Sequence, residues 1–164
     1  FDSLRVPVAW TNAMEYEKGD YTINEAYLDR VEEIINYALD NDMYVIINDH
    51  WDGSWWGMFG SSEQSDVDKA FEMYKSMWTQ IANRYKKYSD RLIFEGANEE
   101  LGDRLNDTDV CKNSGSLSKA ECYEMANKIN QTFVDTIRAT GGNNEQRFLL
   151  IPGYNTDISM TCSD

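Results

Sequence analysis

Hydrophobic positions along this chain alternate between two patterns. Short runs of almost uninterrupted apolar and β-branched residues predict buried strands over residues 4–9, 43–48, 91–94 and 147–151. Between them lie longer segments with an apolar residue every three or four positions, which predict helices over residues 25–40, 66–88 and 118–140. Strands that alternate with amphipathic helices predict an α/β fold in which helices cover a sheet of four parallel strands.

Local signals support these elements. The third predicted helix opens with Ser118-Lys-Ala-Glu121, the pattern of a capping box, and two glycines, Gly141 and Gly142, mark its end. No linker or low-complexity tract interrupts the 164 residues, of which 41% are hydrophobic. The sequence therefore predicts a single domain over residues 1–164 with enough apolar material for a core.

Polar and aromatic residues gather where the predicted strands end. The strand ends supply, in order, Arg5 and Trp10, residues 48–51, the pair Asn98-Glu99, and Tyr154-Asn155. The carboxyl ends of parallel strands meet at one edge of a sheet, and this is the edge at which α/β enzymes bind ligands. We therefore expect a binding site built from these segments.

The pair Asn98-Glu99 is the most informative of them. A carboxylate at the mouth of a cleft is suited to protonate a leaving group, and a neighbouring amide can hydrogen-bond a substrate hydroxyl as charge develops. A pair of this kind also arises by chance in solvated loops, so its meaning depends on the other strand ends.

The segment 49–60 combines glycines with Trp51, Trp55, Trp56 and Phe59. Aromatic faces stack on sugar rings, and the intervening glycines and polar residues favour an exposed binding loop. The alternative is that these rings belong to the core.

Charge and composition restrict the partners. Lys and Arg number 15 against 29 Asp and Glu, a formal net charge of −14 that repels nucleic acid and anionic membranes and favours a neutral substrate. No apolar run approaches the roughly 18 residues of a membrane span.

The single histidine, His50, makes a metal site with Asp49 and Asp52 a minor alternative, so no metal or cofactor is expected. Of the cysteines, Cys111 and Cys122 form a local disulfide or, like Cys162, remain free thiols.

The order of these motifs is similar to that of glycoside hydrolase family 5, the cellulase family. The resemblance rests on Arg5-x-Pro7, the run from Tyr44 to Gly53, Trp78-x-Gln-Ile-Ala-x-Arg-Tyr85, Leu92 to Glu99, and Pro152-Gly-Tyr154. It implies a secreted endo-β-1,4-glucanase with a (β/α)8 barrel, which hydrolyses a cellulose-type β-glucan by retaining double displacement. It further implies that Glu99 is the acid/base, that Asn98 holds the sugar hydroxyl beside the cleaved bond, and that Arg5 and His50 line the central subsite. The family often has a second histidine after His50, and Trp51 replaces it here.

The resemblance covers only part of a barrel. A (β/α)8 barrel needs eight strands and about 250 residues, whereas this chain matches the family's second to fifth strands, half of a TIM barrel. The family's nucleophile comes from the seventh strand, which this chain lacks. Glu100 should point away from Glu99, and Glu95 is expected to pair with Arg5. The second carboxylate would then come from another copy, or from Asp49 or Asp52; the alternative is a non-catalytic β-glucan-binding half-barrel.

A half-barrel also predicts self-association. Cutting a closed sheet leaves two edges and one bare face, and burial of that face would drive two copies together. The residues expected on it are the inward-facing members of Val6, Val8, Val45, Ile47, Leu92, Phe94 and Leu149.

Overall fold

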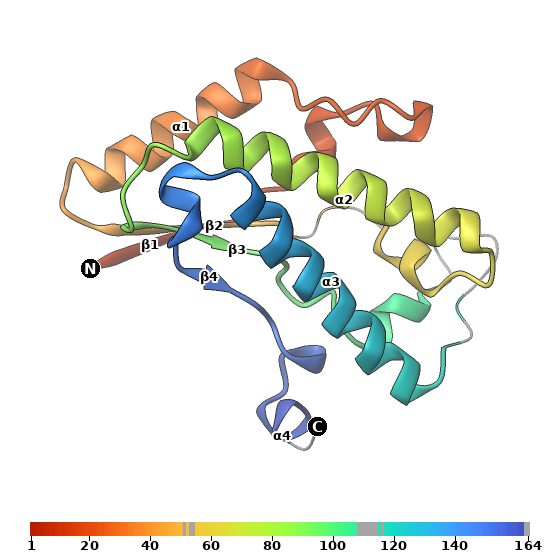
Figure 1. Ribbon diagram of the computed structural model, residues 1–164. Helices are drawn as coiled ribbons and strands as arrows, with labels where there is room; N and C mark the ends of the chain where they lie inside the picture. The colour runs from red at the N-terminus through yellow and green to blue at the C-terminus, as the bar shows by residue number, and fades with distance from the viewer. Residues whose placement is uncertain (51, 53–54, 108–114, 116, 163–164) are drawn as a thin grey trace.

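A parallel four-stranded sheet forms the centre of the molecule (Figure 1). The computed structural model describes residues 1–50, 52, 55–107, 115 and 117–162. The strands are β1 (Ser3–Val6), β2 (Tyr44–Asn48), β3 (Leu92–Glu95) and β4 (Leu149–Leu150), and they lie side by side in chain order. The predicted architecture is thus confirmed, with a fourth strand shorter than expected. Pro152, which has no backbone N–H to donate, follows β4 closely, and the chain then leaves the sheet.

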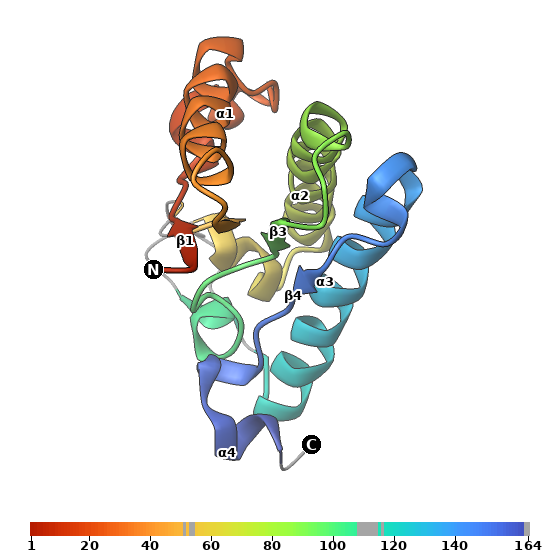
Figure 2. The same ribbon diagram turned by 90° about the vertical axis from the view of Figure 1, so that its left-hand side faces the viewer.

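Three long helices cover one face of the sheet. They are α1 (Glu25–Leu39), α2 (Gln64–Tyr85) and α3 (Lys119–Ala139), and they form an arc outside the arc of strands (Figure 2). The predicted capping box of α3 is present, and Gly141 and Gly142 end this helix with positive φ. A fourth, short helix, α4 (Ile158–Thr161), lies beyond β4 and was not predicted. Within the described residues, no helix is both long and apolar enough to cross a membrane.

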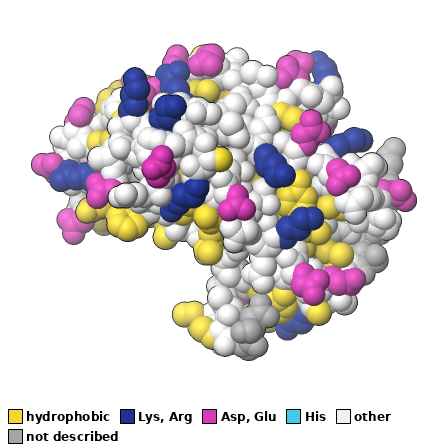
Figure 3. Space-filling model, viewed as in Figure 1, with side chains coloured by type: hydrophobic (Ala, Val, Ile, Leu, Met, Phe, Trp, Pro, Cys, Tyr) yellow, Lys and Arg dark blue, Asp and Glu magenta, His cyan; other side chains and the backbone are white. Residues whose placement is uncertain are grey.

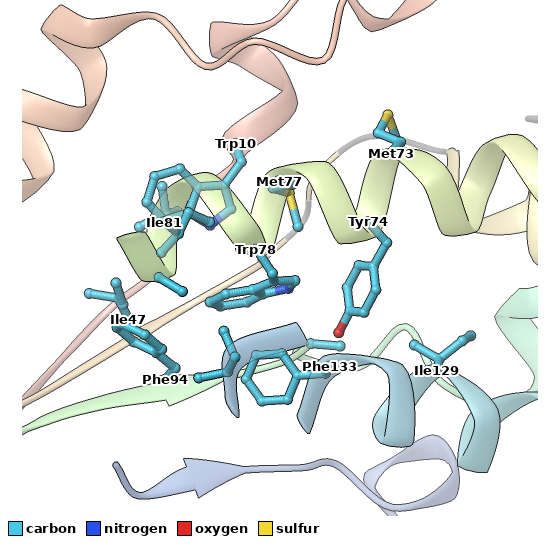
Figure 4. Packing of buried hydrophobic residues seen from close by; sticks show 14 of the residues in the cluster. Trp10, Ile47, Met73, Tyr74, Met77, Trp78, Ile81, Phe94, Ile129 and Phe133 are labelled. Carbon is cyan, nitrogen blue, oxygen red and sulfur yellow. The ribbon is translucent and has the colours of Figure 1, made fainter. Parts of the chain in front are cut away.

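The core lies between the sheet and these helices. Trp78 of α2 packs against Phe94 of β3 and Phe133 of α3, with ring centroids 5.9 and 4.7 Å apart (Figure 4). The predicted stripe of α2 is buried throughout; its members are Ala70, Tyr74, Met77, Trp78, Ile81 and Tyr85. This packing fixes α2 and α3 against β3, the strand that leads to Glu99.

The face of the sheet opposite the helices is bare, but the residues on it are not those expected. Val8, Val45, Ile47, Leu92 and Phe94 are buried against the helices, and Val6 and Leu149 are half-buried against the same core. The bare face instead carries Ile46, Ile93, Phe148 and Leu150, together with the polar pair Arg5 and Glu95. Side chains alternate between the two faces of a strand, so the earlier assignment was wrong by one residue on every strand. Hydrophobic side chains along the lower edge of the body in Figure 3 belong to this side of the molecule.

Arg147 closes the amino-terminal edge of the sheet and is 1% exposed. It donates to the carbonyl oxygens of Tyr85, Tyr88, Ser89 and Leu92 at 2.6–3.2 Å. Its Nε donates to Asn144 at 2.7 Å. Desolvation lowers the pKa of the guanidinium to about 10, which leaves it charged at neutral pH. One side chain therefore satisfies the carbonyls at the end of α2 and at the start of β3.

We predict that Arg147→Lys destabilises the fold by about 3 kcal/mol, because an ammonium group cannot reach all of these buried acceptors. The measurement is the urea dependence of unfolding. The control is Arg91→Lys, since Arg91 makes an exposed ion pair with Asp42 and its replacement should change stability by about 0.5 kcal/mol or less. Equal effects of the two substitutions would contradict this role.

Candidate active site

A cleft of about 410 Å³ opens at the carboxyl edge of the sheet. One wall is polar and comes from β1 and the end of β3, with Arg5, Glu95, Asn98 and Glu99. The opposite wall comes from the chain after β4 and from α4, and is formed by Leu150, Ile151, Pro152, Gly153, Thr156, Ile158, Thr161 and Cys162. In Figure 3 the surface is hollowed between the body and the projecting lobe that ends in α4.

Arg5 connects the polar groups of the cleft. Its Nε and Nη2 donate to the two carboxylate oxygens of Glu95 at 2.7 and 2.8 Å, and Nη2 also donates to Asn98 Oδ1 at 2.8 Å. The expected pairing of Glu95 with Arg5 is therefore confirmed. The hydrogen bond to Glu95 raises the pKa of the Arg5 guanidinium. Because Asn98 Oδ1 accepts from Arg5, its amide nitrogen is turned away from Arg5.

Glu99 and Glu100 point in different directions, as expected. Glu99 is exposed and lines the cleft, whereas Glu100 is 1% exposed and its Oε2 accepts from the backbone N–H of Asn98 at 2.6 Å. The loop is also fixed from beneath, because Tyr74 donates its hydroxyl to the carbonyl of Gly96 at 2.9 Å. A Cβ at Gly96 would lie 3.0 Å from the Phe133 ring, so glycine permits this close approach.

His50 leaves the sheet at the same edge. Its backbone N–H donates to Val8 at 3.0 Å, and its Nδ1 lies 3.3 Å from the side-chain nitrogen of Asn48. His50 is partly buried and does not line the cleft that holds Glu99. Trp51, the other predicted ligand of this segment, lies outside the described residues.

The prediction of an exposed aromatic loop is wrong for Trp55 and Trp56. These side chains are 1% and 2% exposed, and their rings stack on each other with centroids 4.5 Å apart. Both also pack against Phe59 and Tyr74. Glycine serves close packing here, since a Cβ at Gly60 would lie 1.7 Å from the carbonyl oxygen of Leu105.

Asp49 and Asp52 are also buried, each at 0% exposure. Asp52 Oδ1 accepts from the backbone N–H and the hydroxyl of Thr11 at 2.8 and 2.6 Å. Both oxygens of Asp49 lack a donor among the described residues. Neither carboxylate is placed to attack a substrate, so the suggestion that one replaces the nucleophile is wrong. Within the described part of the chain, no cluster of three or more His, Cys, Asp or Glu side chains is suited to a metal ion.

Tyr154 is 3% exposed and does not line the cleft. Its ring stacks on Tyr123 of α3 with centroids 4.0 Å apart, and its hydroxyl donates to Asp103 Oδ1 at 2.7 Å. Burial raises the pKa of this phenol. The expectation that Tyr154 contacts substrate is therefore wrong in this structure, in which the side chain supports the cleft wall from behind.

The structure also places residues that the sequence did not reveal. Thr156 and Ile158 line the cleft although their segment carries no motif or clear periodicity. Cys162 is an exposed free thiol in the same wall, whereas Cys122 is free and buried, so the alternative of a disulfide through Cys122 is not observed. Cys111 lies outside the described residues.

A sheet of parallel strands in chain order, covered on one face by helices, is the architecture of part of a (β/α)8 barrel. The family model of cellulase, glycosyl hydrolase family 5, matches residues 1–164. The chain belongs to this family.

The similarity to individual relatives supports the same family assignment. The chain is 40% identical over 159 residues to a xyloglucan-specific endo-β-1,4-glucanase of Bacteroides ovatus, covering 97% of this chain and 29% of the relative. It is 39% identical to endoglucanase A of Ruminococcus albus, covering 94% of this chain and 39% of the relative. Among solved structures, the Bacteroides ovatus xyloglucanase with a XXXG heptasaccharide aligns with a TM-score of 0.82 at 39% identity, over 99% of this chain and 33% of that one. A broad-specificity endoglucanase of Ruminococcus champanellensis with bound cellotriose gives 0.79 at 39% identity, over 98% and 43%. The chain thus spans well under half the length of these relatives.

The burial of Asp49 near Asp52 predicts that the free energy of unfolding depends on pH. Desolvation, and then the charge of Asp52, raise the pKa of Asp49 well above its usual value. Between the unfolded-state pKa of about 3.9 and this raised value, the folded protein retains a proton that the unfolded chain releases. The contribution of Asp49 to the unfolding free energy therefore falls as pH rises through this window.

We expect Asp49→Asn to remove this pH dependence and to be more stable than the parent at neutral pH, because an amide carries no charge to desolvate. The measurement is the difference in unfolding free energy between the variant and the parent from pH 4 to pH 8. Asp68→Asn, a change at an exposed position of α2, is the control. A constant difference across this range would show that Asp49 is not protonated in the fold.

Proposed function

We propose that this chain forms the acid/base half of an endo-β-1,4-glucanase, which cleaves the internal bonds of a cellulose-type β-glucan. The observation that carries the proposal is the joining of Arg5, Asn98 and Glu95 by hydrogen bonds in the cleft where Glu99 is exposed. The printed names of the relatives support a β-glucan substrate, since they are endoglucanases or xyloglucanases. Such polymers lie outside the cell, which supports a secreted enzyme.

We infer the following role for each group. Glu99 protonates the glycosidic oxygen as the bond breaks and then removes a proton from the attacking water. Asn98, oriented by Arg5, donates its amide N–H to the hydroxyl beside the cleaved bond. This hydrogen bond strengthens as positive charge develops on the sugar, so it favours the transition state over the bound substrate.

The nucleophile is the group still to be assigned. Glu95 and Glu99 are the acidic side chains among the described residues that line the cleft, and Glu95 already pairs with Arg5 through both of its oxygens. Retaining hydrolysis requires a second carboxyl about 5–5.5 Å from the acid. We infer that it comes from outside the described residues and reaches Glu99 across the bare face of the sheet, supplied by further barrel strands or by a second copy.

We predict that Glu99→Gln lowers turnover of soluble cellulose on the order of 100-fold, because the amide has the same shape but no transferable proton. Release of reducing ends gives the rate, and a thermal melt confirms that the fold is retained. Glu145→Gln, in an exposed turn before β4, is the matched control and should keep the parent rate. Equal turnover in the two variants would remove Glu99 from the acid/base role.

A second candidate is a non-catalytic β-glucan-binding half-barrel. It is favoured by the engagement of Glu95 with Arg5, which leaves Glu99 as the one unengaged carboxylate among the described groups of the cleft. The same assay distinguishes the two functions. Binding of cello-oligosaccharides without release of reducing ends would favour the binding module.

We also propose that the isolated chain self-associates through the bare sheet face. Exposed fractions of 58% for Phe148 and 43% for Leu150 leave apolar area there for a second copy to bury. Light scattering should report species above 19.0 kDa, and Phe148→Lys should shift the distribution towards monomer. Tyr37→Lys is the control, because Tyr37 is equally exposed at 57% but lies on α1. A monomer at all micromolar concentrations would contradict this proposal.

A further inference from the structure

The loops that leave β3 and β4 are joined by a reciprocal set of hydrogen bonds. The backbone N–H of Asp103 donates to Asn155 Oδ1 at 2.9 Å, and Asn155 Nδ2 donates to Asp103 Oδ2 at 2.8 Å. The backbone N–H of Asn155 donates to the carbonyl of Leu101 at 2.7 Å. The hydroxyl of Tyr154 donates to the other carboxylate oxygen of Asp103, Oδ1. We refer to these contacts of Asp103 with Tyr154 and Asn155 as the loop clamp.

The loop clamp holds a strained turn. Asn155 and Thr156 have φ of +50° and +52°, in the left-handed region that side chains rarely adopt. Asparagine tolerates this region, but a β-branched threonine does so only where its surroundings impose it. Gly102 makes room for the Asn155 side chain, since a Cβ at Gly102 would lie 1.9 Å from Asn155 Oδ1.

The two loops differ in how firmly they are held without the clamp. The Glu99 loop is fixed by Arg5 on Asn98, by Glu100 on the Asn98 backbone and by Tyr74 on Gly96. The chain after β4 has the strained turn, two hydrogen bonds to α3, from Asn130 to Pro152 and from Tyr123 to Met160, and the stacking of Tyr154 on Tyr123. These contacts attach it to α3 and not to the Glu99 loop. Together with the backbone hydrogen bond from Asn155 to Leu101, the clamp therefore positions the second loop against the first.

The clamp lies behind the cleft wall. Neither Asp103 nor Asn155 lines the cleft, but Gly153, Thr156 and Ile158, which flank Asn155 in the chain, do. A displacement of Asn155 would move these residues relative to Glu99. We propose that Asp103 and Asn155 are positioning residues, which hold the strained turn and thereby fix the distance between the wall after β4 and the wall that bears Glu99.

This inference rests on the proposed function where it concerns substrate, because the clamp would then determine how tightly a glucan chain is bound. Glu99 is held independently, so loss of the clamp should raise KM for the glucan and leave kcat and its pH profile nearly unchanged. A residue needed only for stability would change neither KM nor kcat at temperatures where the fold is intact.

The test exchanges the charge within the clamp. Asn155→Asp places two carboxylates face to face, whereas combining it with Asp103→Asn restores one amide and one carboxylate, and both residue types tolerate positive φ. We expect Asn155→Asp to weaken cellotetraose binding about fivefold at low salt, less at high salt, and the double variant to recover the parent affinity. Amide exchange of Asn155 and Thr156 and the methyl resonance of Ile158 should follow the same order. All variants are compared well below their melting temperatures.

Each outcome decides a separate point. Recovery in the double variant, in both affinity and amide exchange, supports the proposal. Parent-like affinity in Asn155→Asp, or failure of the double variant to recover, overturns it. If the parent chain binds no cellotetraose, the proposed function fails, and the clamp is then tested by amide exchange and the Ile158 methyl resonance alone. The same order across the variants would support the positioning role. Identical exchange and resonances in all variants would overturn it.

Discussion

The ion pair between Arg5 and Glu95 is the interaction on which the site depends. It spans the sheet from β1 to β3, because β2 lies between the two strands. The two side chains lie on the face of the sheet opposite the helices, where Arg5 is 38% and Glu95 14% exposed. A bidentate guanidinium–carboxylate pair is directional, so it fixes the orientation of both groups as well as neutralising them. Asn98 shares the same guanidinium, and the orientation of its amide therefore depends on the register of three strands.

The helices make that register possible. Apolar residues on the covered face, such as Val45, Ile47, Leu92 and Phe94, are buried against α1, α2 and α3. A slip of one residue would place them on the bare face and would carry Arg5 and Glu95 into the core, where unpaired charge is costly. Hydrophobic burial on one side of the sheet thus determines the polar geometry on the other.

The sequence predicted the elements well but their surroundings poorly. Periodicity identified three helices and four strands because it reports local geometry, and the capping box and the double glycine act within one turn of helix. It failed where the answer depends on contacts distant in sequence. A short, uninterrupted apolar strand does not reveal which face is covered, so the face assignment of all four strands was wrong by one position.

The predictions for Trp55, Trp56 and Tyr154 were wrong for the same reason. Glycines around Trp55 and Trp56 were interpreted as signs of an exposed loop, whereas Gly60 permits the backbone of residue 105 to approach the segment closely. The polar wall of the cleft, in contrast, was predicted, since Arg5, Asn98 and Glu99 each follow or lie in a strand whose end is fixed by the fold. The wall after β4 was not predicted, because a turn with two residues at positive φ carries no periodic signal.

Buried carboxylates near the site add a further constraint. Asp49, Asp52 and Glu100 are each 1% exposed or less. Asp52 accepts a hydrogen bond from the backbone of Thr11, and Glu100 accepts one from the backbone of Asn98 in its own loop. Such acceptors determine loop conformation, because a backbone N–H left without one in the interior costs about 1–3 kcal/mol. Asp49 lacks a donor among the described residues, and its pKa is raised by desolvation first and then by the charges of Asp52 and Glu100. The raised pKa favours the neutral form of Asp49, so the segment that leads to His50 contains a buried neutral acid rather than a buried charge.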